Sequence, residues 1–194
     1  MLRVFFALFI AFILSGCRFT SVQHYDRQSV ITWHEVINQY QRRVDLIPEL
    51  ISVVKKYTGD DLHALTALKR AKDSAYHAGL MLTAPCDSLS FITRWQQAQR
   101  DLSQALNETL TLSVQHSDLS ADQRFVNLLV QLESRTQRIN IARDRHIEAI
   151  KNYNLHVRKF PTFFLARAMN YSPRQNHPAL APVETLYVYD IDFN

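Results

Sequence analysis

The sequence predicts an all-α protein, a long antiparallel up-down four-helix bundle followed by an irregular C-terminal tail. Apolar residues recur at steps of three and four over long stretches, which is the period of an amphipathic helix. Only 3 of the 194 residues are glycine, which argues against a turn-rich β fold. The connections between the periodic stretches are short, which favours helices that fold back on one another. A coiled-coil oligomer is the competing interpretation, because the apolar seams are heptad-like.

The N-terminal residues predict a lipoprotein signal peptide, residues 1–16. Arg3 precedes an uncharged apolar run from Val4 to Leu14, shorter than the roughly 20 residues of a transmembrane helix. The run ends in Leu14-Ser15-Gly16-Cys17, which resembles the lipobox of bacterial lipoproteins. We therefore expect the Cys17 thiol to carry lipid, including acyl chains such as palmitate, with residues 17–28 as a tether. An uncleaved signal anchor and an ordinary signal peptide are the alternatives.

The first predicted helix of the bundle, residues 29–168, has one apolar seam. Pro48 lies within it, and a proline inside a helix removes a hydrogen bond, so we expect a kink near Val44–Pro48 or two abutting helices. Gly59 is placed near a C-cap and Asp60 or Asp61 at the next N-cap. The seam consists of Trp33, Ile37, Tyr40, Val44, Ile47, Ile51 and Val54.

The second helix is predicted over 61–82 and a loop over 83–88, in which Ser88 or Asp87 is the expected cap of a third helix that runs to about Gln115. Residues 116–120 read as a turn, and Ser120 with Gln123 fits a capping box for the next helix. The core residues predicted for the second helix are smaller than those of the first, namely Leu62, Leu65, Leu68, Ala71, Ala75 and Ala78. The third has Phe91, Trp95, Ala98, Leu102, Ala105 and Thr109 at core positions.

The fourth helix has the clearest pattern, because no glycine or proline interrupts residues 121–159. Phe160-Pro161 ends it. The tail, residues 169–194, looks irregular, with a β-prone segment over 186–193 that either pairs with a partner edge or lies along the bundle or is disordered. The stripe of the fourth helix consists of Phe125, Leu129, Leu132, Thr136, Ile139, Ala142, His146, Ile150, Tyr153 and Val157.

The charge of the chain argues against a nucleic-acid-binding protein, and its cysteine content argues against an intramolecular disulfide. The formal net charge of +4 is mild and the charges are interleaved, whereas a nucleic-acid binder usually concentrates a basic patch. If Cys17 is acylated, Cys86 has no partner, so we expect a free loop thiol rather than an intramolecular disulfide; an intermolecular disulfide is the alternative.

Several motifs resemble the LemA family, and together they cover about Trp33–Ala168. The most specific is the run Gln41-Arg-Arg-Val-Asp-Leu-Ile-Pro-Glu-Leu50. The others are Trp33-x-x-Val36, Val53-Val-Lys-Lys-Tyr57, Arg124-Phe-x-x-Leu128, Leu132-Glu133, Arg138-Ile139, Ala142-Arg143, Tyr153-Asn154 and Phe160-Pro161.

The resemblance implies a membrane-tethered helical bundle whose biochemical role is poorly defined. The chain departs from the family pattern by using a lipobox in place of an uncleaved transmembrane helix. Glu49 stands where asparagine is commoner, and the β-prone tail reads as an addition.

Charged residues of the Arg-Arg-x-Asp run are expected to have a structural role. Asp45 lies one position beyond the seam residue Val44, so we expect it to be partly buried, and a buried carboxylate needs a partner. The structural ion-pair candidates are Arg42, Arg43, Asp45, Arg138 and Arg143. A recognition surface is the alternative to this interhelical network.

No motif predicts a catalytic, metal or cofactor site. The eight histidines are dispersed, without the paired Glu-x-x-His motifs of di-iron bundles, and His146 on the fourth stripe reads as a core histidine. There is no Gly-x-Ser-x-Gly elbow. The apolar cluster Phe160–Leu165 is expected to cap the end of the bundle; insertion into lipid and binding of a partner are the alternatives.

These features predict a membrane-anchored, non-catalytic interaction or scaffold protein of the bacterial cell envelope. Its expected partners are the membrane, through acylated Cys17, and an unidentified envelope protein, with a homo-oligomer as a further option. Arg18, rather than an aspartate, follows Cys17, which favours the outer membrane facing the periplasm in a source with two membranes. The alternative functions are a module that binds lipid or cell-wall fragments through the bundle core or the Phe160 cluster, and an enzyme, which would need a convergent polar pocket.

Overall fold

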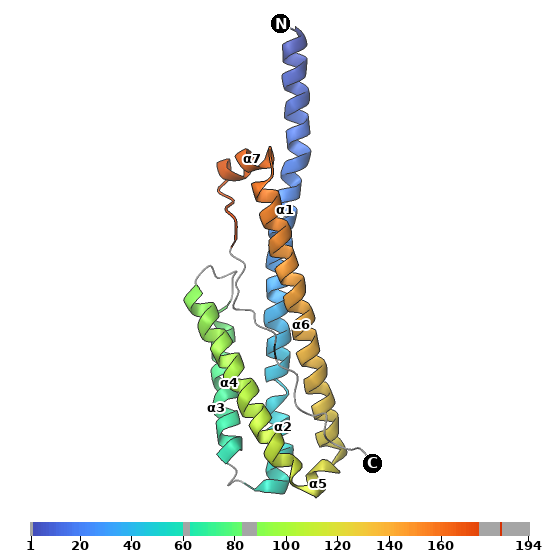
Figure 1. Cartoon of the computed structure of the whole chain (residues 1–194), viewed down its shortest axis with the longest axis vertical. Helices are drawn as coiled ribbons and strands as arrows, with labels where there is room; N and C mark the ends of the chain where they lie inside the picture. Colours follow the sequence, from blue (N-terminus) through green and yellow to red (C-terminus); the bar gives the residue numbers. More distant parts are fainter. Residues whose placement is uncertain (1, 60–62, 83–88, 175–182, 184–194) are drawn as a thin grey trace. The chain divides into compact units, whose positions relative to one another are not determined.

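The computed structural model describes residues 2–59, 63–82, 89–174 and 183, with side chains from Val22 onward apart from Leu89, Val114 and Leu165. Within these ranges all regular structure is helical, which confirms the all-α prediction. The helices are α1 (Leu2–Val44), α2 (Ile47–Thr58), α3 (His63–Leu80), α4 (Leu89–Val114), α5 (Ser117–Ser120), α6 (Gln123–Arg158) and α7 (Thr162–Ala168) (Figure 1). The loop over 83–88 and the β-prone segment over 186–193 lie outside the described residues.

The chain divides into two compact units. One comprises Met1–His34 and Arg143–His177, and the other comprises Glu35–Ala142 and Pro178–Asn194. We call them the terminal unit and the central unit. Helices α1 and α6 contribute residues to both units. The boundary between the units also divides the segment predicted as the bundle, residues 29–168, and the segment predicted as the tail, residues 169–194.

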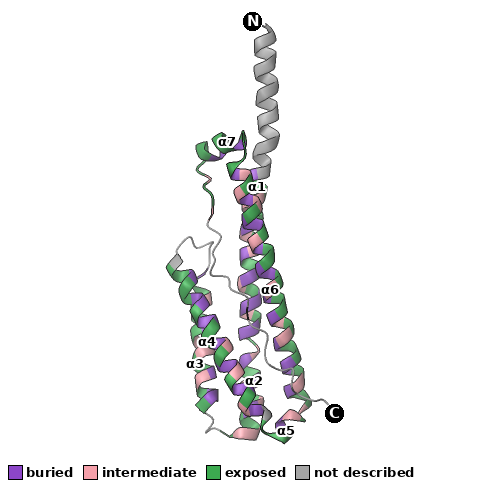
Figure 2. Cartoon of the chain, viewed as in Figure 1, coloured by how far each residue is buried: buried purple, intermediate pink, exposed green. Residues whose placement is uncertain are grey.

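The core of the central unit contains residues from all four predicted helical segments. Leu50, Leu68, Leu102 and Leu132 come from α2, α3, α4 and α6, and all are buried in one cluster. Burial of each leucine contributes roughly 1.5–3 kcal/mol relative to exposure. Helices α3 and α4 lie side by side (Figure 1), and buried residues recur along their facing sides (Figure 2).

The break around Pro48 has a local cause. Helix α1 ends at Val44 and α2 begins at Ile47, so the second of the two expectations, abutting helices, is correct. Pro48 falls in the first turn of α2, where its missing N–H would have had no helical partner. At the other end of α2, Gly59 caps the helix with φ 75°, and its N–H donates to the Lys55 carbonyl at 2.9 Å.

The register of α4 follows the predicted pattern except at its start. Trp95, Leu102 and Thr109 are buried, but Phe91 is 44% exposed and Ile92 takes the core position. The prediction for Phe91 is therefore wrong. Phe91 lies in the first turn of α4. There the buried residue is Ile92, three positions before Trp95, rather than Phe91, four positions before it.

All ten predicted stripe residues of α6 are buried. The predicted capping box at its start is wrong, because α6 begins at Gln123, which makes Asp122 rather than Ser120 the residue before the helix. Asp122 caps α6 instead: its carboxylate accepts from the Arg124 N–H at 2.7 Å. The predicted turn over 116–120 contains the short helix α5.

The terminal unit has a small core of its own. Val22, Tyr153, Val157 and Ala166 pack together from α1, α6 and α7. Residues 17–28, which the sequence predicted as a tether, belong to helix α1. Val22 within this segment is only 1% exposed, so the segment contributes to the core.

Candidate functional site

A buried arginine lies in the interior of the central unit. Arg43 is 1% exposed, and its Nη2 donates to the Ser103 hydroxyl of α4 at 2.6 Å. Its Nε has no hydrogen-bond partner among the described residues. Desolvation by burial lowers the pKa of Arg43 to about 10, against a smaller opposing effect of Tyr40. Sequence reasoning placed Arg43 among the ion-pair candidates but gave no signal that, within the described residues, its partner would be a buried hydroxyl rather than a carboxylate.

The remaining ion-pair candidates do not gather around Arg43. Arg42, Asp45 and Arg138 are exposed, so the expected partial burial of Asp45 is wrong. The Asp45 carboxylate accepts from the Gln41 side chain at 3.0 Å. Helix α1 ends one residue before Asp45, so the seam of α1 does not continue to it. Arg143, in the terminal unit, is buried and pairs with its exposed neighbour Asp144 at 3.6 Å.

Glutamines accompany Arg43 in the interior of the central unit. Gln39 on α1 and Gln96 and Gln99 on α4 are each less than 10% exposed, and each has one side-chain atom without a hydrogen-bond partner among the described residues. A buried amide that lacks a partner costs about 1–3 kcal/mol. The interior of this unit therefore contains unsatisfied polar groups, which the apolar periodicity did not predict.

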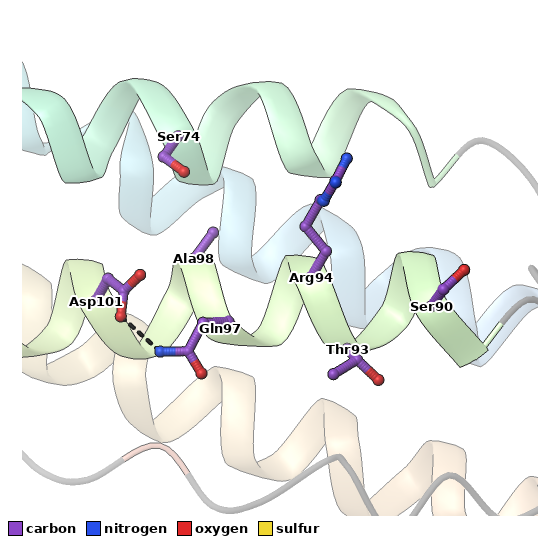
Figure 3. A pocket seen from close by; sticks show the side chains of 7 residues that line it. All are labelled: Ser74, Ser90, Thr93, Arg94, Gln97, Ala98 and Asp101. Carbon is purple, nitrogen blue, oxygen red and sulfur yellow. Dashed lines mark hydrogen bonds between the residues drawn. The ribbon is translucent and has the colours of Figure 1, made fainter.

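An open groove of about 880 Å³ runs between α3 and α4. Figure 3 shows Ser74 on α3 facing the side chains of α4, with Gln97 donating to the Asp101 carboxylate at 2.7 Å. The Arg100 guanidinium in turn donates to the side-chain amide oxygen of Gln97 at 2.6 Å. These groups are exposed and bonded to one another, an arrangement that suits contact with a polar surface. The lining comprises Ser74, Ser90, Thr93, Arg94, Gln97, Ala98 and Asp101.

A second surface is formed by the phenylalanines around α7. Phe160 is 76%, Phe163 42% and Phe164 65% exposed. Their rings contact one another edge to face, with centroids 6.2 Å apart for Phe160–Phe164 and 5.6 Å for Phe163–Phe164. The expectation that this cluster caps the bundle end is wrong, because Thr162 and Ala166 occupy the buried face of α7 instead.

The segment after α7 is held by α6. Asn154 donates its amide to the Arg174 carbonyl at 2.7 Å and accepts from the Arg174 N–H at 2.8 Å. The Tyr153 hydroxyl donates to the Ser172 carbonyl at 3.0 Å. The Arg174 guanidinium pairs with Asp26 of α1 at 2.8 Å and donates to the Ser29 hydroxyl. The motif Tyr153-Asn154 therefore fixes the chain that follows α7.

An equivalent amide bracket is present in the central unit. The Asn140 side chain donates to the Val183 carbonyl at 3.1 Å and accepts from the Val183 N–H at 3.0 Å. The same unit contains a bond between α2 and the start of α6, in which the Tyr57 hydroxyl donates to the Asp122 carboxylate at 2.6 Å. That bond, followed by the bond from the Arg124 N–H, lowers the pKa of Asp122.

His146 is buried, as expected for a core histidine. Its Nδ1 lies 3.1 Å from the Thr32 hydroxyl, and its ring packs on Trp33 with centroids 5.2 Å apart. Among the described residues, no three histidine, cysteine, aspartate or glutamate side chains gather as metal ligands would. The side chains of Cys17 and Cys86 lie outside the described part of the structure.

Comparison with known protein families shows the family to which this chain belongs. The sequence model of the LemA family matches residues 32–193. The chain belongs to the LemA family. This match extends to residue 193, so the expectation that the C-terminal tail is an addition to the LemA pattern is wrong. The Val183 bracket shows how part of the tail attaches to α6 in this LemA protein.

No match to the chain was found among curated proteins. Within the described residues, no helix has the length and apolar character that a bilayer crossing requires.

Proposed function

We propose that this LemA protein is a lipid-anchored component of the bacterial cell envelope that acts as a non-catalytic scaffold. The supporting observation is the continuity between the lipobox and the folded protein. Cys17 lies within α1, five positions before Val22, which is buried in the core of the terminal unit. Acylation of Cys17 would therefore hold the helical protein at the membrane surface without a long flexible linker.

The groove between α3 and α4 is the surface that we assign to the protein partner. Its lining offers hydroxyl, amide, guanidinium and carboxylate groups from α3 and α4 (Figure 3), which favours a polar partner surface over an apolar one. The partner expected from the lipid anchor is another protein of the envelope, and the membrane is the outer one, facing the periplasm, if the source has two.

Site-specific photo-crosslinking in living cells tests this role. A photoreactive residue at Gln97, in the groove, is compared with one at Gln131, which is exposed on α6 of the same unit. The scaffold role predicts a discrete crosslinked product from position 97 in the membrane fraction and none from position 131. Equal, diffuse products from both positions would count against the groove and against the scaffold role assigned to it.

A further inference from the structure

We propose that the exposed phenylalanines around α7 insert into the surface of a bilayer that contains anionic phospholipid, as a second membrane contact beside the acylated cysteine. This inference rests on the proposed function in one respect, the lipid on Cys17. Its own evidence is the apolar face of α7, the charge of the segment around it, and the position of α7 in the terminal unit.

The apolar face is continuous and lies on the outer side of α7. Phe163 and Phe164 lie on α7, and Phe160 lies two residues before its start, where its ring contacts that of Phe164. The opposite face, with Thr162 and Ala166, is buried. Figure 2 shows α7 largely in the colour of exposed residues. Three exposed aromatic rings, of which Phe164 contacts the other two, are unusual for a surface that meets only water, and such patches mark protein or membrane contacts.

The charge of the segment selects the lipid surface. Between Ala149 and Val183 the sequence contains five lysines and arginines and no acidic residue. Arg158, Lys159 and Arg167 are exposed beside the phenylalanines. The nearby carboxylate of Asp26 is paired with Arg174. Aromatic side chains flanked by basic ones match the interface of an anionic bilayer, where the rings enter the headgroup boundary and the cations meet phosphate.

The position of α7 brings this face to the level of the lipid anchor. Ala166 of α7 packs in one cluster with Val22 of α1, and Cys17 precedes Val22 by five helical residues, a rise of roughly 8 Å. Acyl chains on Cys17 would enter the bilayer within reach of the phenylalanines. The terminal unit thereby offers one covalent and one non-covalent contact to the same membrane, which satisfies the general need for two signals in stable anchoring.

Quenching by brominated lipid tests the insertion in the full lipidated protein. The protein is purified from membranes and reconstituted into vesicles of phosphatidylethanolamine and phosphatidylglycerol with bromine on the acyl chains. Phe164→Trp is the reporter. Val130→Trp is the matched control, since Val130 is 62% exposed, close to the 65% of Phe164, but lies 28 positions before Arg158 on α6. The parent chain, with buried Trp33 and Trp95, supplies the background.

We expect the emission of the Phe164→Trp variant to shift to the blue and to be quenched by the brominated lipid, while the Val130→Trp variant stays at background. Equal quenching in the two variants, or none in either, would overturn the inference. Protection of the Phe164→Trp reporter from an aqueous quencher without quenching by lipid would also overturn it, because protein, including a second copy of the chain, would then cover the face.

Intact mass of the same sample separates the two proposals. An acylated mass with no lipid quenching at position 164 leaves the anchor standing and removes the α7 contact. An unacylated mass with quenching at position 164 removes the anchor and supports the α7 contact as a membrane interaction in its own right.

Discussion

The side-chain amide of Asn154 forms both of its hydrogen bonds with one residue, donating to the carbonyl of Arg174 and accepting from its N–H. This geometry imitates a step of a β ladder, with a side chain in place of the second strand. It secures an extended segment to a helix without any regular structure in that segment. The same arrangement between Asn140 and Val183 indicates that α6 uses asparagine repeatedly for this purpose.

Replacement of Asn154 tests the bracket. Asn154→Ala removes two partly buried hydrogen bonds, each with a net contribution of about 1 kcal/mol, so we expect the free energy of unfolding to fall by about 1–2 kcal/mol. Limited proteolysis should also cut sooner after α7. Asn152→Ala is the control, since Asn152 lies two positions earlier on the same helix. Equal effects of the two substitutions would show that the bracket does not stabilise the protein.

Arg43 provides a second test, because its guanidinium is buried with a hydroxyl as its hydrogen-bond partner. The lowering of its pKa from its ordinary value to about 10 corresponds to a cost of roughly 3 kcal/mol for the charged form, at about 1.4 kcal/mol per pH unit. Arg43→Met should therefore be neutral or stabilising at pH 7. Ser103→Ala should destabilise by about 1–3 kcal/mol, because it leaves the cation without its acceptor.

The pH dependence of the Arg43→Met comparison has a defined sign. Between the folded-state pKa of Arg43, about 10, and its higher pKa in the unfolded chain, the unfolded chain keeps the proton while the folded chain releases it, so the burial cost falls as the pH rises. Denaturant titrations should show the advantage of Arg43→Met shrinking above pH 10. Arg42→Met, at the exposed neighbouring position, should stay within about 0.5 kcal/mol of wild type. Strong destabilisation by Arg43→Met would mean that an anion compensates Arg43.

Tyr57 and Asp122 link α2 to the start of α6, and their bond is sensitive to acid. The pKa of Asp122 is lowered chiefly by the Tyr57 hydroxyl, so the stabilisation is present above the unfolded pKa and is lost as the pH falls through the folded value. Tyr57→Phe should destabilise at pH 7 and have less effect below the folded pKa of Asp122. It should also raise that pKa in an NMR titration. Tyr76→Phe, on exposed α3 surface, is the control; an unchanged Asp122 titration in Tyr57→Phe would refute the assigned cause.

Replacing Gly59 and replacing Gly79 by alanine should change the stability of the protein in opposite directions. Gly59 has φ 75°, a conformation that side chains rarely adopt, although a Cβ would meet no atom within 4 Å. Gly59→Ala should therefore destabilise by about 1–3 kcal/mol through the backbone alone. Gly79 lies inside α3, where a Cβ would approach the Gln41 side chain at an ordinary 3.7 Å, so Gly79→Ala should stabilise by up to about 1 kcal/mol. Thermal melting of both variants checks the pair, and a shared sign would contradict the assignment.

The sequence correctly predicts the features of the fold that depend on the spacing of apolar residues. The stripe of α6 is correct at all ten positions, because a long uninterrupted helix keeps one face inward. The break at Pro48 and the cap at Gly59 follow from backbone chemistry that each residue carries with it.

The errors fall where a helix begins or ends or where a polar group is buried. Phe91, Asp45 and Ser120 all lie within a turn of a helix end, where periodicity no longer fixes the direction of a side chain. The burial of Arg43 depends on Ser103, sixty positions away, and no local pattern predicts such a pair. The exposure of Phe164 depends on which face of α7 packs against α1 and α6, which seven residues of sequence do not specify.

The most direct test of the central claim, that Cys17 anchors this LemA protein in the membrane, is the intact mass of the wild type beside Cys17→Ala, each taken from fractionated cells. The account predicts that wild type sediments with membranes and has the mass of residues 17–194 plus acyl chains. It predicts that Cys17→Ala retains residues 1–16 and carries no lipid. A wild type that is unacylated and free of the membrane fraction would contradict the account.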